Sequence, residues 1–136
     1  MDNPDFNPAL VGIQILTTYL PTHSRPEDDQ YTFAYTITIS NASDQPVQLL
    51  SRHWVITDAN NSVQEVRGEG VVGEQPVIPP EQSFRYTSGA TLQTPVGYME
   101  GSYTMIIPEG EVDLTEQTAF EIPIPAFTLH TPTALN

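Results

Sequence analysis

The glycine segment Gly68-Glu69-Gly70-Val71-Val72-Gly73, followed by Glu74-Gln75-Pro76-Val77-Ile78-Pro79-Pro80, decides the fold of this chain. Its glycines have the G-x-G-x-x-G spacing of a dinucleotide-binding fingerprint. That fingerprint requires a helix directly after the glycines, because the helix N-terminus faces the pyrophosphate. Pro76, Pro79 and Pro80 remove backbone donors and exclude a continuing helix. The glycines are therefore predicted to lie in a loop between β-strands.

Alternation of apolar and polar residues predicts strands on both sides of this loop. Residues 31–39 alternate strictly between large apolar side chains and threonine or alanine, which is typical of a half-buried antiparallel strand. In the strand predicted over 47–57, Leu49 and Val55 are expected on one face and Trp54 and Ile56 on the other. Further strands are expected at 11–15, 63–66, 84–87, 97–107 and 119–129.

Short strands at even spacing, separated by turn signals, predict an all-β protein. No window shows the i, i+3, i+4 apolar stripe of an amphipathic helix. We expect an antiparallel β-sandwich, with a small barrel as the alternative. Pro123 and Pro125 interrupt the last strand, so that strand can occupy only the edge of a sheet. Residues 1–9 are predicted to be a flexible segment, 10–130 the sandwich domain, and 131–136 a tail.

Composition excludes several classes of function. The chain contains seventeen acidic residues, four arginines and no lysine, which gives a net charge of −13. This charge disfavours nucleic acid and anionic membrane as partners. The chain has no cysteine, which excludes disulfides, thiolate catalysis and cysteine-ligated zinc. No apolar run is long enough to span a membrane, and no secretory signal opens the chain. These features favour a cytoplasmic protein.

The glycine segment is the first candidate site. Backbone N–H groups of Gly68, Gly70 and Gly73, helped by Arg67, could form a nest for an anion. The competing interpretation is structural: glycine permits a positive φ and a close approach of two backbones. Glutamates at positions 69 and 74 would repel a phosphate, so the structural interpretation is favoured.

Arg52-His53-Trp54 is the second candidate. Arg52 and Trp54 share one face of their strand and His53 takes the other. If both are partly exposed, Arg52 and His53 could form a small polar pocket near the glycine loop. Trp54, the only tryptophan, is assigned to the core in preference to a ligand platform. No nucleophile and orienting acid accompany His53 in the sequence, so no catalytic residue is assigned.

Metal ligation has weak support. His23, His53 and His130 lack the spacing of metal ligands. The carboxylate clusters at 27–29 and 109–113 could hold a hard cation only weakly, and both are expected to be solvated loops. We therefore predict neither a metal site nor a cofactor.

Several blocks of this chain, taken together, resemble the ApaG family. They span roughly residues 10 to 130 in order, and the first two are highly specific as a pair. The blocks are Arg52-His53-Trp54-Val55-Ile56-Thr57-Asp58, Gly68-Glu69-Gly70-Val71-Val72-Gly73-Glu74-Gln75-Pro76, Phe84-Arg85-Tyr86-Thr87-Ser88-Gly89, Gly97-Tyr98-Met99-Glu100-Gly101-Ser102-Tyr103 and Ile124-Pro125-Ala126-Phe127. Where the family often has Pro-Gly, this chain has Pro80-Glu81.

The resemblance implies a fibronectin type III-like, immunoglobulin-like β-sandwich and a bacterial cytoplasmic protein. It also implies an association with cobalt resistance and magnesium efflux, and it suggests an interaction module with a protein partner. An acidic domain without a membrane span would act on efflux indirectly. Three hypotheses follow: a non-enzymatic binding module, a pyrophosphate- or nucleotide-binding protein that uses the 68–73 loop, and, with least support, a hydrolase.

Overall fold

The computed structural model describes residues 6–108 and 119–133. This part of the chain consists of eight strands and three short 3-10 turns. The turns are η1 (Pro8–Leu10), η2 (Pro21–His23) and η3 (Pro26–Asp28). The strands are β1 (Val11–Tyr19), β2 (Tyr31–Asn41), β3 (Val47–Asp58), β4 (Val63–Glu69), β5 (Val77–Ile78), β6 (Gln82–Leu92), β7 (Val96–Ile106) and β8 (Phe120–His130).

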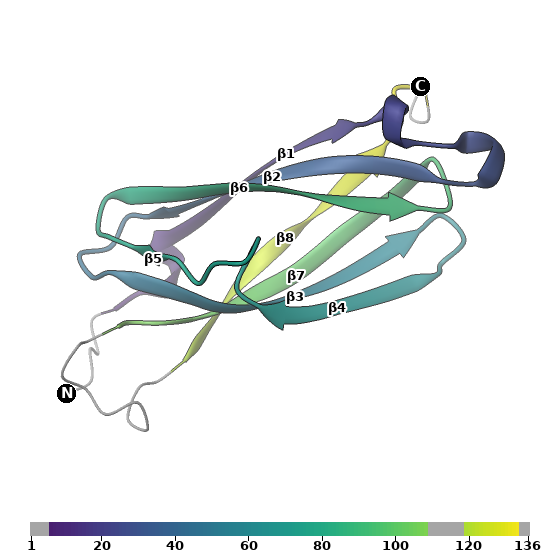
Figure 1. Ribbon diagram of the computed structural model, residues 1–136. Helices are drawn as coiled ribbons and strands as arrows, with labels where there is room; N and C mark the ends of the chain where they lie inside the picture. The colour runs from purple at the N-terminus through teal and green to yellow at the C-terminus, as the bar shows by residue number, and fades with distance from the viewer. Residues whose placement is uncertain (1–5, 109–118, 134–136) are drawn as a thin grey trace.

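The strands form two antiparallel sheets packed face to face (Figure 1). One sheet has the order β1-β2-β6. The other has the order β4-β3-β7-β8, and the short β5 also pairs with β3. The predicted fold class, an all-β antiparallel sandwich of the fibronectin type III-like kind, is confirmed. No helix in the described residues is long and apolar enough to cross a membrane.

The core lies between the sheets and follows the predicted alternation on β2. Phe33, Ile37 and Ile39 are almost completely buried. The intervening threonines lie on the outer face, where Thr32 and Thr36 form hydroxyl hydrogen bonds of 2.9 and 2.8 Å to threonines 91 and 87 of β6. Period-two alternation therefore places one apolar and one polar surface on the same strand.

A β-bulge in β3 changes which residues face the core. The register with β7 shifts between Leu49 and Ser51, so one extra residue is inserted there. Leu49 is consequently buried together with Trp54 and Ile56. The prediction that Leu49 lies on the face opposite Trp54 is wrong, because an inserted residue reverses the alternation beyond it.

The two edges of the larger sheet differ in chemistry. β8 is an edge strand, as its two prolines predicted. β4 forms the other edge (Figure 1). Its residues are exposed apart from the half-buried Gly68. The segment that connects β4 to β5 contains Gly70 and Gly73. It lies against the first half of β3, where Gly70 N donates to Leu50 O and Leu49 N donates to Pro76 O.

Candidate functional site

The glycine segment begins in a strand and ends in a tight turn. Gly68 belongs to β4, where it pairs with Arg52 of β3, so the prediction that all three glycines lie in a loop is wrong for Gly68. Gly70 and Gly73 follow the strand with φ values of +65° and +83°, in the left-handed region that glycine tolerates best. No helix follows them; β5 does, which removes the dinucleotide-fingerprint interpretation.

Backbone amides of the turn are used inside the protein. Gly70 N donates to Leu50 O at 2.8 Å, and Val71 and Glu74 exchange hydrogen bonds of 2.8 and 2.9 Å. These N–H groups therefore hold the turn onto β3 and onto itself. These three amides are therefore not available to a bound anion.

Arg52 is the side chain that the turn positions. Its Nη1 donates to the carbonyl oxygens of Glu69 at 3.1 Å and Gly70 at 2.8 Å. The guanidinium lies directly over Gly68, where a Cβ atom would be 2.8 Å from Nη1. A side chain at position 68 would therefore have to displace the Arg52 guanidinium, and Gly68 does not have a positive φ. No carboxylate oxygen of the described residues lies within 4.0 Å of the Arg52 guanidinium.

Arg52 lines a cavity of about 250 Å³ between the sheets. The cavity is built from the turn and from residues of four strands, β2, β3, β4 and β6. Its other lining residues are Tyr35, Trp54, Glu69, Val71, Val72, Gly73, Tyr86 and Ser88. Sequence reasoning missed Tyr35, Tyr86 and Ser88, because alternation shows that they face inward but not which distant residue they meet.

Buried aromatic side chains form one wall of this cavity. Trp54 is only 2% exposed, and its Nε1 has no hydrogen-bond partner among the described residues. The hydroxyl groups of Tyr86 and Tyr103 are joined by a hydrogen bond of 2.5 Å. Burial raises the pKa of both tyrosines above their usual range, so both remain neutral hydrogen-bonding groups. Trp54 is therefore a core residue, as predicted, and it also borders the cavity.

Val72 at the rim of the cavity has a strained backbone. Its φ is +43°, which is rare for a β-branched residue, and its side chain is 55% exposed. Strain of this kind costs free energy and persists only where the surrounding structure enforces it. The turn therefore holds an apolar side chain in solvent at the rim of the cavity that Arg52 lines.

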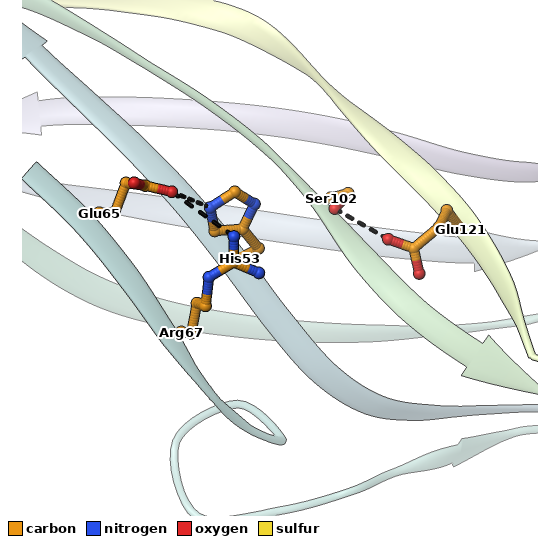
Figure 2. Close-up of polar contacts among 5 residues, drawn as sticks. All are labelled: His53, Glu65, Arg67, Ser102 and Glu121. Atoms are coloured by element: carbon orange, nitrogen blue, oxygen red, sulfur yellow. Dashed lines mark hydrogen bonds and ion pairs between the residues drawn. The ribbon is translucent and has the colours of Figure 1, made fainter.

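His53 lies on the outer face of the same strand, away from the cavity. Its Nε2 is 2.8 Å from Oε1 of Glu65, and Arg67 lies 3.6 Å from the same oxygen (Figure 2). The hydrogen bond from His53, together with its charge, lowers the pKa of Glu65. Ser102, the neighbour of His53 on β7, donates instead to Glu121 at 3.2 Å.

These positions correct the expected polar pocket. Arg52 and His53 are on opposite faces of β3 and do not share a pocket, because successive side chains of a strand alternate. Arg67 is exposed on the outer face beside Glu65. The cavity thus brings together Arg52 and the glycine turn, and it leaves out His53 and Arg67.

The structure brings no metal-ligating cluster together in the part that it describes. No group of three or more His, Asp or Glu side chains there is placed to hold a metal ion. Glu27 and Asp28 belong to η3, and Asp29, which caps its C-terminal end, adopts a left-handed conformation with φ +54°. The acidic segment 109–113 lies outside the described residues.

Comparison with known proteins extends over nearly the whole chain. A family model described as the ApaG domain matches residues 21–107. The protein ApaG of Dechloromonas aromatica (strain RCB) is 50% identical over 132 residues, covering 97% of this chain and 98% of that protein. The protein ApaG of Ralstonia nicotianae is 54% identical over 124 residues, covering 91% and 94%. The crystal structure of the putative ApaA protein from Bordetella pertussis has a TM-score of 0.81 at 45% identity, covering 90% and 94%.

Proposed function

The chain belongs to the ApaG family, and from this membership we propose that it is a non-enzymatic binding module of the cytoplasm. In this proposal it influences cobalt resistance and magnesium efflux indirectly, by binding a protein partner. The unpaired charge of Arg52 in the cavity is the observation that carries the proposal. The Arg52 side chain is half-buried and has no carboxylate partner among the described residues, so an anionic group of a bound molecule could form a charge-assisted hydrogen bond with it.

The geometry supports binding better than catalysis. Arg52 is anchored through Nη1 to two backbone carbonyls, so its position is set before any ligand arrives. The neighbouring tyrosines are neutral and buried, and His53 is engaged with Glu65 on the other face. The surroundings therefore offer a charge, hydroxyl groups and an indole N–H, which together suit recognition of a carboxylate on a partner protein.

Complementation in a strain that lacks this gene tests the proposal. Arg52→Met removes the guanidinium but keeps an unbranched side chain, and Arg85→Met makes the same change at an exposed position of β6. We expect wild type and Arg85→Met to restore growth in cobalt and Arg52→Met to fail, with all three proteins equally folded by circular dichroism. Restoration by Arg52→Met would reject the cavity as the binding site. Failure of the wild type would reject the link to cobalt.

Pyrophosphate or a nucleotide is the second candidate ligand, because a guanidinium also recognises phosphate. The cavity is smaller than the roughly 300–1,000 Å³ sites that hold drug-sized ligands, so it would accommodate a phosphate group and not a whole nucleotide. Glu69 on its lining and Glu74 in the turn oppose an anion of high charge.

Calorimetry with pyrophosphate and diadenosine tetraphosphate, with and without magnesium, decides this second candidate. Saturable binding tighter than about 100 μM, or roughly 5.5 kcal/mol, would support it, provided that Arg52→Met loses the binding and Arg85→Met keeps it. Absence of binding would reject the phosphate ligand. That result would leave the protein-partner proposal to the cobalt assay.

A further inference from the structure

The edge strand β4 carries a pattern that the proposed function does not use. It is an unprotected edge, since Val63–Glu69 contains no proline or lysine and almost all of it is exposed. At the opposite edge of the sheet, β8 lacks two backbone donors because of Pro123 and Pro125. Of the two edge strands of this sheet, β4 and β8 (Figure 1), β4 therefore presents the more complete row of backbone hydrogen-bonding groups.

Two hydrogen bonds that flank the β3–β4 ladder show which backbone groups point outward. Asp58 N donates to Ser62 O at 3.0 Å, and Gly70 N donates to Leu50 O at 2.8 Å. With the register Thr57↔Val63 and Ser51↔Glu69, these bonds identify both pairs as non-hydrogen-bonded pairs. By alternation, the N–H and C=O groups at 63, 65, 67 and 69 point away from β3. The Glu69 carbonyl already accepts from Arg52, and no other described segment covers this row.

The sequence of β4 is complementary to itself in the antiparallel direction. We propose that two copies of this chain pair β4 to β4 about a twofold axis through Val66. Glu65 of each copy then lies opposite Arg67 of the partner subunit, and the two Val66 side chains meet at the axis. In this register, each residue whose backbone N–H and C=O point away from β3 lies opposite another such residue of the partner strand. The free backbone groups and the charge pattern therefore require the same register.

Side-chain positions agree with this pairing. Glu65 and Arg67 are on the same face of the sheet, 3.6 Å apart beside His53 (Figure 2). Pairing would bring together two carboxylates and two guanidinium groups in alternation on that face. Val66 points to the other face and is 37% exposed, so pairing would remove apolar surface from water. No comparable pattern occurs on the edges β1 and β6, since β1 has no charged residue and β6 has only Arg85.

Net charge limits the strength of this dimer. Each chain carries −13, and the long-range repulsion is screened over roughly 10 Å at 0.1 M salt. A pair of seven-residue strands also buries less than the roughly 1,200 Å² of a standard stable interface. We therefore expect a transient dimer that forms at high protein concentration and moderate salt.

Sedimentation velocity of two charge variants and their mixture tests the proposal. Glu65→Arg and Arg67→Glu each place like charges opposite one another in the homodimer, so each variant should sediment as a monomer where the wild type associates. An equimolar mixture should associate again, because every position 65–67 pair then has opposite charges. The variants carry −11 and −15, so the mixed dimer has the same total charge as the wild-type dimer. The long-range repulsion between two Glu65→Arg chains is weaker than between two wild-type chains, because each variant chain carries −11 and not −13. If this variant fails to associate, the cause must therefore be the like charges that face each other at positions 65 and 67.

Amide exchange of the wild type supplies a measurement that needs no variant. Raising the protein concentration should slow exchange of the outward amides at 65 and 67 at least several-fold. The amides of Gln64 and Val66, which point toward β3, should not change. A wild type that stays monomeric up to about 1 mM, a dimer that both variants retain, or a mixture that fails to associate would overturn the proposal.

Discussion

Replacing Gly70 by alanine should destabilise the protein much more than the same change at Gly73, because only Gly70 combines strain with close contact. Both residues have positive φ values, +65° and +83°. A Cβ at Gly70 would lie 2.2 Å from the carbonyl oxygen of Glu74, whereas a Cβ at Gly73 meets nothing within 4 Å. The Glu74 oxygen cannot easily retreat, because it accepts a hydrogen bond from Val71 N.

The two costs can be estimated separately. A left-handed conformation costs alanine roughly 1–2 kcal/mol, offset by about 0.4–1 kcal/mol because alanine restricts the unfolded chain. Gly73→Ala should therefore lower the free energy of unfolding by about 1 kcal/mol. Gly70→Ala adds the cost of overpacking, roughly 1–3 kcal/mol, which gives a total loss of about 2–4 kcal/mol.

Urea unfolding followed by the fluorescence of Trp54, the only tryptophan, measures both losses. Gly73→Ala is the matched control, since it has the same strain in open space. Equal losses in the two variants would show that the turn relaxes around the new methyl group. The reasoning from the 2.2 Å contact would then be refuted.

Four further predictions concern stability. Trp54→Ala should cost about 3–5 kcal/mol in urea unfolding, because Trp54 is buried and packs edge-on against Tyr103; an unchanged midpoint would contradict its core position. Glu81→Gly should raise the free energy of unfolding by about 0.5–1 kcal/mol, because Glu81 has a φ of +64°, in the left-handed region that glycine tolerates best; a loss of stability in the same assay would contradict this. The melting temperature should rise between low and moderate sodium chloride, since a net charge of −13 repels itself; a flat or falling curve would show that ion pairs of the arginines dominate. Stability should also fall above pH 10. The folded state keeps protons on Tyr86 and Tyr103 that the unfolded chain releases, so their contribution is complete below the unfolded pKa of about 10 and declines by about 1.4 kcal/mol per pH unit for each tyrosine above it. The double variant Tyr86→Phe, Tyr103→Phe should lose this slope between pH 10 and 11.

Local sequence patterns determined the architecture. Alternation over β2 predicted its buried face, two prolines predicted the edge position of β8, and the prolines after Gly73 excluded a nucleotide-binding helix. Each of these rests on the geometry of a few consecutive residues, which is the same wherever the strand lies. The assignment of Trp54 to the core follows from similarly general preferences for burial.

Only the tertiary structure decided the site. The extra residue near Leu50 is visible in the register of β3 against β7, and it turns Arg52 toward the cavity and His53 toward solvent. The cavity itself joins Arg52 to Tyr86, which is distant in sequence and lies in the other sheet. A bulge depends on the pairing of two strands and a cavity on the packing of two sheets. Neither leaves a periodic signal in the sequence, because both arise from contacts between segments far apart in the chain.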